Sequence, residues 1–387
     1  MSVNGSGLRR DVRNGRGLRV LIACGMTDKK LRQKLQPIVA SPVVEEILLV
    51  RRRPYAGEKI RCYAVPRVLR RSLLMAECWR LLATLYLCVL RRPDVAVCMT
   101  LLLHGLHTYA AHVLFDVPLV HHLMGKVDLQ LHRPRPPWLR RLMWWFSLRA
   151  DVLVVRGGPT RQRFIGSGRV PPERVFVQHN VFDMTAYTPD AAVPKRYDVA
   201  YVGYLAAYKR VDLLIEVVAK LRSRRDTVNL AIAGEGDQRR YMERLAAELK
   251  VRDCITFLGT CDEDRLIQVL RSSRVFAMTS LGEGLPQAMI EAMACGLPCV
   301  LFDDADMREI VRPGDNGILV PPGDIETFAD QVDRLLSDRE HYQRIAASAA
   351  RIHEEYGRLF AVEAQAEIWT AAIRAAREAS LFRSRGQ

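Results

Sequence analysis

The chain has 387 residues, 49% of them hydrophobic, and a formal net charge of +15. This length and apolar content allow two domains of similar size and exclude an intrinsically disordered protein. The nine cysteines form no CxxC pair and have no zinc-type spacing with histidine, which argues against a metal site. Their odd number and scattered positions predict reduced thiols, as in a cytoplasmic protein.

The positive charge lies in the N-terminal half of the chain. Residues 1–197 have 33 Lys and Arg against 13 Asp and Glu, a net charge of +20, whereas residues 198–387 have 25 against 30, a net charge of −5. The asymmetry predicts an anionic partner for the first half: a membrane surface, a phosphorylated acceptor or nucleic acid. The alternative is a solvated basic face without a partner. No nucleic-acid-binding module is recognisable, so nucleic acid is disfavoured.

Residues 1–17 are polar and basic, with no apolar segment before Leu18, and they predict a disordered tail without a secretory signal. From there to residue 190, short apolar runs alternate with helical stretches. The predicted strands cover residues 18–23, 46–50, 94–99, 118–121, 151–155 and 175–178, and the longest helix covers residues 67–90. This order predicts a Rossmann-like N-terminal domain, residues 18–190, with a parallel sheet.

The pattern starts again after an irregular linker at residues 180–195. Strands are predicted at residues 197–203, 229–234, 255–259, 275–279 and 298–302, with a helical segment between each pair. A second Rossmann-like domain therefore covers residues 191–360, and residues 361–387 predict a helix that packs back on the first domain. The expected α/β fold has two doubly wound domains facing a central cleft, where ligands bind at the carboxyl ends of the strands.

Two apolar segments raise the question of a membrane. Residues 72–90 are interrupted by Glu77 and Arg80, and a charge in hydrocarbon costs about 2.5–3.5 kcal/mol on insertion scales. A helix inside the first domain therefore explains this segment better than a membrane span. Residues 136–149 combine Trp138 and other apolar residues at helical spacing with arginines. They predict either an interfacial helix on anionic lipid or an ordinary domain helix with a buried aromatic face.

The most informative segment is SLGEGLPQAMIEAMACGLPCV, residues 280–300. It follows a predicted strand, and Pro286 suits the first position of the next helix. The free N–H groups in the first turn of this helix would point into the cleft and suit a diphosphate. Glu283 precedes the helix and can bind sugar hydroxyls. Glu291 lies inside it and can accept hydrogen bonds from a ribose diol.

A second candidate site follows the strand at residues 197–203. Gly203 lets the backbone approach a ligand closely, because it has no Cβ. Lys209 comes six residues later and is placed to neutralise a phosphate as a point charge, with Arg210 next to it. This loop and the Glu283 loop belong to the same predicted sheet, so both are expected at the same edge.

Five segments of the second half carry a family resemblance: VGYLAAYKRVD, LAIAGEGD, ITFLG, EGLPQAMIEAMACGLPCV and EIVRPGDNGILVPPGD. They cover most of residues 198–338 and are similar to the donor domain of the retaining glycosyltransferases of family 4, among the glycosyl transferases of group 1. In the first half, ADVLVV and VFVQHNVFD fit the family more loosely. The resemblance implies the GT-B fold and a metal-independent, retaining transfer of a hexose from a nucleotide-sugar donor to an acceptor.

The resemblance also implies roles for individual residues. Glu283 would contact the donor sugar, Glu291 the ribose and Lys209 the diphosphate. His121, or else His122, would hydrogen-bond and orient the transferred sugar, unless the pair only caps a strand. The catalytic set implied is His121, Glu283 and Lys209. Further donor contacts are implied for Gly203, Arg210, Gly234, Gly284 and Leu285, and Gly25 would belong to an acceptor or phosphate loop.

The sequence departs from the family after Gly203, where Tyr204 stands in place of a frequent arginine. Arg210 is the candidate substitute. The family needs no enzyme nucleophile, because the departing phosphate helps to deprotonate the acceptor, and catalysis is mainly positioning and charge stabilisation. This argues against an acid and nucleophile pair as in glycosidases. Residues 304–306 have the DxD form of metal-dependent transferases, which we interpret as incidental, and no metal or other cofactor is expected.

Other functions remain open at this point. A GT-B partner subunit could keep the fold without catalysis and bind nucleotide or membrane, and a nucleotide-sugar epimerase could use a similar architecture. The basic first half favours a lipid-linked acceptor or another anionic or glycan acceptor, as in polysaccharide or glycolipid biosynthesis. The expected location is the cytoplasm, with peripheral contact to the inner face of the membrane.

Overall fold

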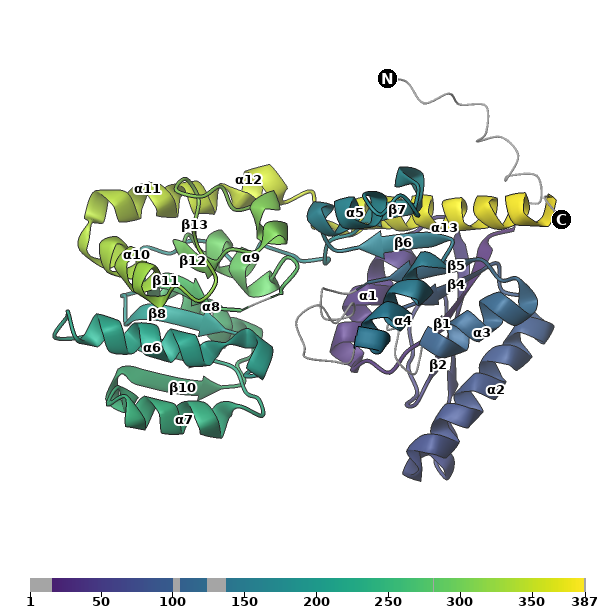
Figure 1. The fold of residues 1–387 in the computed structure, drawn as a ribbon, viewed down its shortest axis with the longest axis horizontal. Coiled ribbons are helices and arrows are strands. Elements are labelled where there is room, and N and C mark those ends of the chain that lie inside the picture. Colours follow the sequence, from purple (N-terminus) through teal and green to yellow (C-terminus); the bar gives the residue numbers. More distant parts are fainter. Residues whose placement is uncertain (1–15, 100–104, 124–136, 281, 386–387) are drawn as a thin grey trace, which may run out of the picture.

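The computed structural model of the protein describes residues 16–99, 105–123, 137–280 and 282–385. Two lobes lie side by side, each built on a sheet with helices on both faces (Figure 1). The N-terminal sheet has the strand order β3-β2-β1-β4-β5-β6-β7, and the C-terminal sheet the order β10-β9-β8-β11-β12-β13. Neighbouring strands are parallel in both sheets. The predicted fold class, two doubly wound Rossmann-like domains, is confirmed.

The N-terminal sheet is apolar on both faces. Along β1, Val20 and Ile22 pack toward α1 and α13, whereas Leu21 and Ala23 pack in the cluster that contains α2, α3 and α4. Strands buried on both faces read as continuous apolar runs, which is why the sequence revealed them. The strands are β1 (Leu18–Ala23), β2 (Val44–Arg51), β3 (Ile60–Ala64), β4 (Val95–Cys98), β5 (Leu119–His122), β6 (Val152–Val155) and β7 (Val175–Val177).

The helices of the N-terminal lobe are α1 (Asp28–Ala40), α2 (Leu73–Arg91), α3 (Leu106–Phe115), α4 (Pro137–Leu148) and α5 (Gly158–Ile165). The helix predicted over residues 67–90 is shorter and is preceded by the 3₁₀ turn η2 (Leu69–Arg71). Ser72 ends that turn and caps α2, because its side chain accepts a hydrogen bond from the Met75 N–H at 3.4 Å. Strand β3 was not predicted, since its half-exposed sequence at the sheet edge has no apolar run.

The C-terminal lobe has one large core cluster around its sheet, and Tyr197, Ala231 and Val269 form a small second one. Its strands are β8 (Tyr197–Val202), β9 (Leu230–Ala233), β10 (Ile255–Gly259), β11 (Ser273–Met278), β12 (Cys299–Phe302) and β13 (Ile318–Val320). Its helices are α6 (Val211–Arg222), α7 (Arg239–Glu248), α8 (Glu263–Arg271), α9 (Gln287–Ala294), α10 (Ile325–Ser337), α11 (Arg339–Ala350) and α12 (Ile352–Tyr356). The short edge strand β13 was not predicted.

The chain crosses between the lobes twice, and hydrogen bonds join the two crossing segments. Phe182 N–H donates to the carbonyl of Phe360 at 3.1 Å, and His179 N–H donates to the side chain of Gln365 at 2.9 Å. After the second crossing, α13 (Val362–Arg385) runs along the N-terminal lobe (Figure 1). Trp369 of α13 is buried in the N-terminal core, so the end of the chain stabilises the lobe in which the chain begins.

Candidate functional site

Two glycine-containing loops meet at the carboxyl edge of the C-terminal sheet. Gly203 N–H donates to Ala233 O at 3.0 Å, and Gly234 N–H donates to Gly259 O at 2.8 Å. A Cβ added to Gly234 would lie 1.9 Å from Gly203 O, and Gly234 has a φ of +155°. These glycines therefore allow two loop backbones to touch, a packing role that the sequence did not predict. Their contact with a nucleotide stays a prediction.

Lys209 and Glu283 come together from opposite loops. Lys209 ends the 3₁₀ turn η5 (Ala207–Lys209) after β8, whereas Glu283 lies in the loop after β11. The Lys209 ammonium donates to Glu283 Oε1, and the two side chains are 15% and 16% exposed. Beside them Tyr201 is fully buried; burial raises the pKa of its hydroxyl, and the Glu283 carboxylate adds to that rise. The ion pair thus lies in a poorly solvated place, where a cation acts strongly on an anion.

Helix α9 follows the Glu283 loop. Pro286 is its N-cap, with φ −70° and ψ 126°, so the helix begins one residue later than predicted. Leu285 is buried, and Gly284 faces the other lobe: a Cβ added there would lie 3.4 Å from Arg156 Cβ. Glu291 is buried and accepts a hydrogen bond from the Gln287 side chain at 2.9 Å. The loop therefore lies against the N-terminal lobe at Gly284.

A pocket of about 700 Å³ lies between the lobes. Gln287 and Glu291 of α9 line it together with Glu263 at the start of α8, and Gln33 and Gln36 of α1 line it from the N-terminal lobe. A volume of this order suits a small-molecule ligand. Glu291, predicted to bind a ribose, thus opens on a cavity that both lobes form.

The cation predicted beside Lys209 is engaged elsewhere. The Arg210 guanidinium donates to the Asp212 carboxylate through Nε at 3.1 Å and through Nη2 at 3.0 Å. This pairing raises the pKa of Arg210. Tyr204, in the position where the family often has arginine, is 58% exposed. Lys209 is therefore the residue of this loop whose charge meets Glu283.

His121 and His122 end β5, and both are buried. Burial lowers the pKa of His121 to about 4. The pKa of His122 falls well below its ordinary value, through burial first and then through the charges of Lys34 and Arg156. Both rings are thus neutral at pH 7. They lie at the carboxyl end of β5, the edge of the N-terminal sheet where ligands are expected. Their contact with a sugar stays a prediction.

Gly25, exposed after β1, lies in a different pocket. This pocket of about 300 Å³ is lined by residues 25–28 and 51–53. Arg51 is buried there and pairs with the Asp28 carboxylate at 2.8 Å. Gly25 is therefore separate from the 700 Å³ pocket, and its role as an acceptor or phosphate loop stays a prediction.

The acidic residues of the DxD sequence take part in structural contacts. Asp304 caps the 3₁₀ turn η7 (Ala305–Glu309) by accepting from the Asp306 N–H at 3.2 Å. Asp306 accepts from the Thr160 hydroxyl of the other lobe at 3.2 Å, and Glu309 accepts from the Gly158 N–H at the start of α5. Within the described ranges, no three His, Cys, Asp or Glu side chains are grouped to hold a metal ion.

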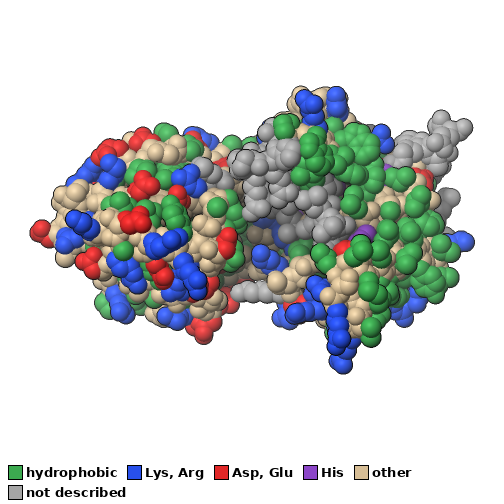
Figure 2. Space-filling model, turned by 60° about the horizontal axis from the view of Figure 1, so that its bottom comes forward, with side chains coloured by type: hydrophobic (Ala, Val, Ile, Leu, Met, Phe, Trp, Pro, Cys, Tyr) green, Lys and Arg blue, Asp and Glu red, His purple; other side chains and the backbone are tan. Residues whose placement is uncertain are grey.

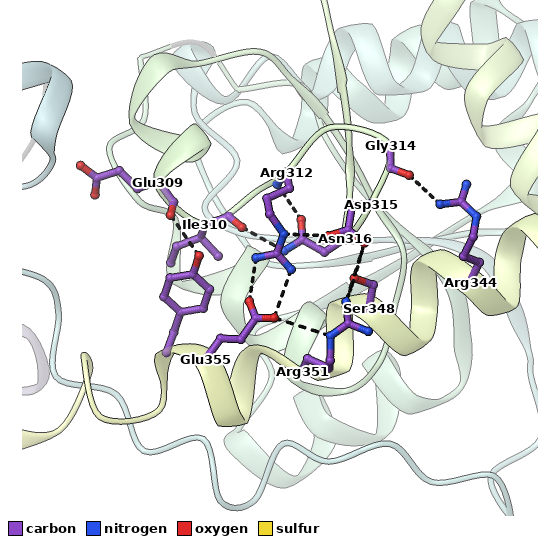
Figure 3. Close-up of polar contacts among 11 residues, drawn as sticks. Glu309, Ile310, Arg312, Gly314, Asp315, Asn316, Arg344, Ser348, Arg351 and Glu355 are labelled. Atoms are coloured by element: carbon purple, nitrogen blue, oxygen red, sulfur yellow. Dashed lines mark hydrogen bonds and ion pairs between the residues drawn. The ribbon is translucent and has the colours of Figure 1, made fainter.

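Glu309 and the loop that follows it are bound to α12 (Figure 3). The Tyr356 hydroxyl donates to Glu309 O at 3.3 Å, and the Asn316 amide donates to Ile310 O at 2.9 Å. Arg312 bridges Asp315 and Glu355 at 2.7 Å each and lowers the pKa of Glu355. The pKa of Asp315 is lowered first by the hydrogen bond from the Ser348 hydroxyl and then by Arg312. This network fastens the loop between β12 and β13 to α12 and holds η7 against the N-terminal lobe.

Three polar residues joined by hydrogen bonds, one of which approaches Gly284, were not predicted from the sequence. Arg156 follows β6 directly, Lys34 lies on α1, and Asn180 lies in the first crossing. Arg156 could have been found from its position after a predicted strand, because ligands gather at carboxyl strand ends. Lys34 gave no comparable signal, since a lysine on a helix is usually solvated.

Comparisons with known proteins agree with this architecture. Residues 188–352 match the sequence model of the glycosyl transferases group 1 family. An uncharacterized glycosyltransferase of Methanocaldococcus jannaschii is 35% identical over 159 residues, 41% of this chain and 40% of the relative. The D-inositol 3-phosphate glycosyltransferase of Mycobacteroides abscessus is 28% identical over 250 residues, 60% of this chain and 56% of the relative. The chain thus spans about half the length of these curated relatives.

The similarity in fold to solved structures covers both lobes. The crystal structure of HepE from Anabaena in complex with UDP and glucose has a TM-score of 0.70 to this protein at 17% identity, and the match covers 92% of this chain and 100% of that one. An identity this low concerns the fold alone, and the shared fold is the two-lobed GT-B arrangement. In sequence, residues 188–352 are similar to the glycosyl transferases of group 1.

Proposed function

We propose that this protein is a retaining glycosyltransferase that moves a hexose from a nucleotide-sugar donor to an acceptor without a metal ion. The proposal rests on the meeting of Lys209 with Glu283 beside the start of α9, which carries Glu291 into the interlobe pocket. A cation, a hydroxyl-binding carboxylate and a helix start together suit a departing diphosphate and a sugar. The UDP and glucose bound by HepE support the same class of donor.

The proposed transfer needs no covalent intermediate. The bond between the sugar C1 and the diphosphate oxygen breaks, and the acceptor oxygen bonds to C1 on the same face. The acceptor proton passes to the departing phosphate oxygen, so the diphosphate leaves with its negative charge beside Lys209. His121 is neutral at pH 7 because burial lowers its pKa to about 4, and it hydrogen-bonds a sugar hydroxyl. The protein thus contributes positioning and charge stabilisation.

A donor panel tests this function. The purified chain is incubated with UDP-, GDP- and ADP-sugars and a crude lipid extract, and release of the nucleoside diphosphate is measured. We expect release with one donor class, unchanged by EDTA. Glu291→Ala should raise the donor KM roughly 10- to 100-fold, since it removes hydrogen bonds to a charged group. Glu248→Ala, an exposed glutamate on α7, serves as the matched control.

Two results would count against the proposal. Loss of release in EDTA would contradict metal independence. No release with any donor would favour the second candidate, a GT-B partner subunit without catalysis. Tyr204 is the observation behind this candidate, because it is uncharged and exposed where the family often has an arginine.

The acceptor side of the proposal is a lipid-linked acceptor at an anionic membrane, and helix α2 supports it. Among the described helices, α2 alone is long and apolar enough to cross a membrane by length and composition. Its polar side chains face inward: Arg80 is buried, pairs with Glu77 at 2.8 Å and donates to Cys24 O at 2.9 Å. Its outer face is apolar, with Leu74 74% exposed and Leu82 66% exposed. A surface helix usually turns its apolar side chains inward, and α2 turns them outward, so its apolar face is exposed to water.

The apolar surface continues over the next two helices. Helix α3 packs on α2, and Tyr109 of α3 meets Phe146 of α4 edge to face at 4.7 Å. Helix α4 turns Met143 inward and leaves Trp138 exposed, so it is both a domain helix and an exposed aromatic surface. Figure 2 shows hydrophobic side chains gathered on the N-terminal lobe, whereas charges of both signs are mixed over the other lobe. The arginines on η2, α2 and α4, or next to them in the chain, include Arg67, Arg70, Arg71, Arg91, Arg92, Arg141 and Arg149.

We expect the full chain to sediment with vesicles that contain phosphatidylglycerol, and to do so less in high salt. The double variant Leu74→Glu with Leu82→Glu should weaken this binding at least about 10-fold, because two inserted leucines are lost. The pair Tyr241→Glu with Leu249→Glu, exposed on the other lobe, is the control. Equal binding by both pairs, or a dimer that only the α2 pair disrupts, would contradict a lipid contact.

A further inference from the structure

The C-terminal lobe has a pocket of its own, which we call the α10–α11 pocket. Its volume is about 300 Å³, and it is lined by the loop before β13, by β13 and by helices α10 and α11. None of the described residues that line it is acidic, and none of them also lines the pocket between the lobes. The polar side chains on its wall are Thr327, Gln331, Arg334, His341 and Arg344.

His341 contributes a buried hydrogen-bond donor to this wall. Its side chain is 9% exposed, and Arg344 Nη2 donates to His341 Nδ1 at 3.0 Å. A guanidinium can only donate, so Nδ1 is the acceptor, and a neutral ring then has its hydrogen on Nε2. Burial, followed by the charges of Arg334 and Arg344, lowers the pKa of His341, so the ring is neutral at pH 7. Nε2 has no hydrogen-bond partner among the described residues, and a buried donor without an acceptor costs free energy.

Two arginines add positive charge to the same pocket. Arg344 Nη1 donates to Gly314 O at 2.8 Å (Figure 3), and its other described contact is with the neutral His341 ring. The Arg334 guanidinium makes no hydrogen bond or ion pair to a described residue. Asp338 acts on the His341 ring, but its carboxylate caps α11 by accepting from the His341 N–H at 2.9 Å, and it does not line the pocket. The pocket therefore has two cations and one N–H donor on a wall without a carboxylate.

We infer that the α10–α11 pocket binds a small oxyanion, either phosphate or the phosphate group of a small ester, through Arg334, Arg344 and the Nε2–H of His341. Phosphate oxygens accept charge-assisted hydrogen bonds from arginine, which are stronger than those between neutral groups. The Gln331 amide on the same wall can donate as well. The site goes beyond the proposed sugar transfer and does not depend on it, because the two pockets share no lining residue.

An NMR titration tests the site at His341 itself. The full chain is labelled with ¹⁵N-histidine, and the ring signals of His341 are identified by their absence in His341→Gln. Inorganic phosphate and glucose 1-phosphate are added in separate arms, and we expect the Nε2–H signal to shift and then saturate. Arg334→Gln should raise the Kd of phosphate roughly 10-fold, the loss expected for a charge-assisted contact. Arg339→Gln is the matched control, because Arg339 is exposed on α11 but does not line the pocket.

The two arms identify the source of the oxyanion. A lower Kd for glucose 1-phosphate would indicate a phosphorylated small molecule, and a lower or equal Kd for inorganic phosphate would indicate the free ion. Unchanged His341 signals at roughly 50 mM phosphate, which almost fills a millimolar site, would overturn the inference. An equal shift with sodium chloride at the same ionic strength, or an equal loss in Arg339→Gln, would also overturn it, since the effect would then follow charge alone.

Two further variants keep the result tied to this pocket. A shift that disappears in Lys209→Met would place the anion at the candidate donor site and would contradict the inference. Should His341→Gln fail to fold, Arg344→Gln identifies the same ring signals, because it removes the partner of Nδ1.

Discussion

Lys209→Met is expected to lower the turnover of sugar transfer by roughly 10²- to 10³-fold, the usual loss when one donor to a developing anion is removed. Methionine keeps most of the length of the side chain but removes its charge. Lys209 contacts Glu283 at a poorly solvated place beside the start of α9. A leaving diphosphate there gains negative charge in the transition state, so the variant should lose turnover more than donor affinity.

Lys220→Met is the matched control, because Lys220 lies on α6 of the same lobe and pairs with Glu326 at the surface. It should change turnover less than about twofold, since surface ion pairs contribute little. The variant Lys209→Met also leaves Glu283 without this cation, so its unfolding midpoint is measured beside its kinetics. A turnover above a tenth of the wild-type value in a folded Lys209→Met protein would exclude Lys209 from stabilising the leaving group.

Gly234→Ala is expected to destabilise the C-terminal lobe by about 3 kcal/mol or more, through steric overlap together with backbone strain. The new Cβ would lie 1.9 Å from Gly203 O, a backbone atom that cannot turn aside as a side chain can. The φ of +155° adds strain for any residue other than glycine. The loop of Gly203 would have to move, and Lys209 lies six residues further along the same loop.

The effect is measured by urea unfolding, with the transition of the C-terminal lobe followed separately because a two-lobed protein need not unfold in one step. Gly314→Ala is the control: it has a φ of +80°, but nothing lies within 4 Å of the added Cβ. It should cost only the strain, about 1–2 kcal/mol. Equal losses in the two variants would mean that the loops of β8 and β9 separate easily, which would contradict a rigid contact between them.

The features predicted best from the sequence are those that depend on neighbouring residues. Strands such as β1 and β12 are buried on both faces, so each one is a continuous apolar run with turn residues at its ends. Strand β11, the Glu283 loop and α9 follow one another directly in the chain. Their order can therefore be predicted from neighbouring residues. The half-exposed β3 has no such run, and β13 is apolar but only three residues long, so both were missed.

The tertiary structure decided what depends on residues far apart in the chain. The sequence left the partner of Lys209 open, and folding brought Glu283 to it across 74 positions while Arg210 turned to Asp212. Helix α2 shows the same limit. Its apolar residues predicted a helix inside the domain, but the contact of Arg80 with Cys24 O turned its polar side inward and its leucines outward.

The sequence by itself therefore determined the two doubly wound lobes and the local frame of the donor site, because burial pattern and turn chemistry act over a few residues. The tertiary structure alone decided which charges meet and which apolar face stays exposed. Lys34, Arg156 and Asn180 come from three separate segments, and only the packing of α1 against the sheet and the first crossing makes them neighbours. Electrostatic and packing energies depend on distance in space, which separation along the chain does not specify.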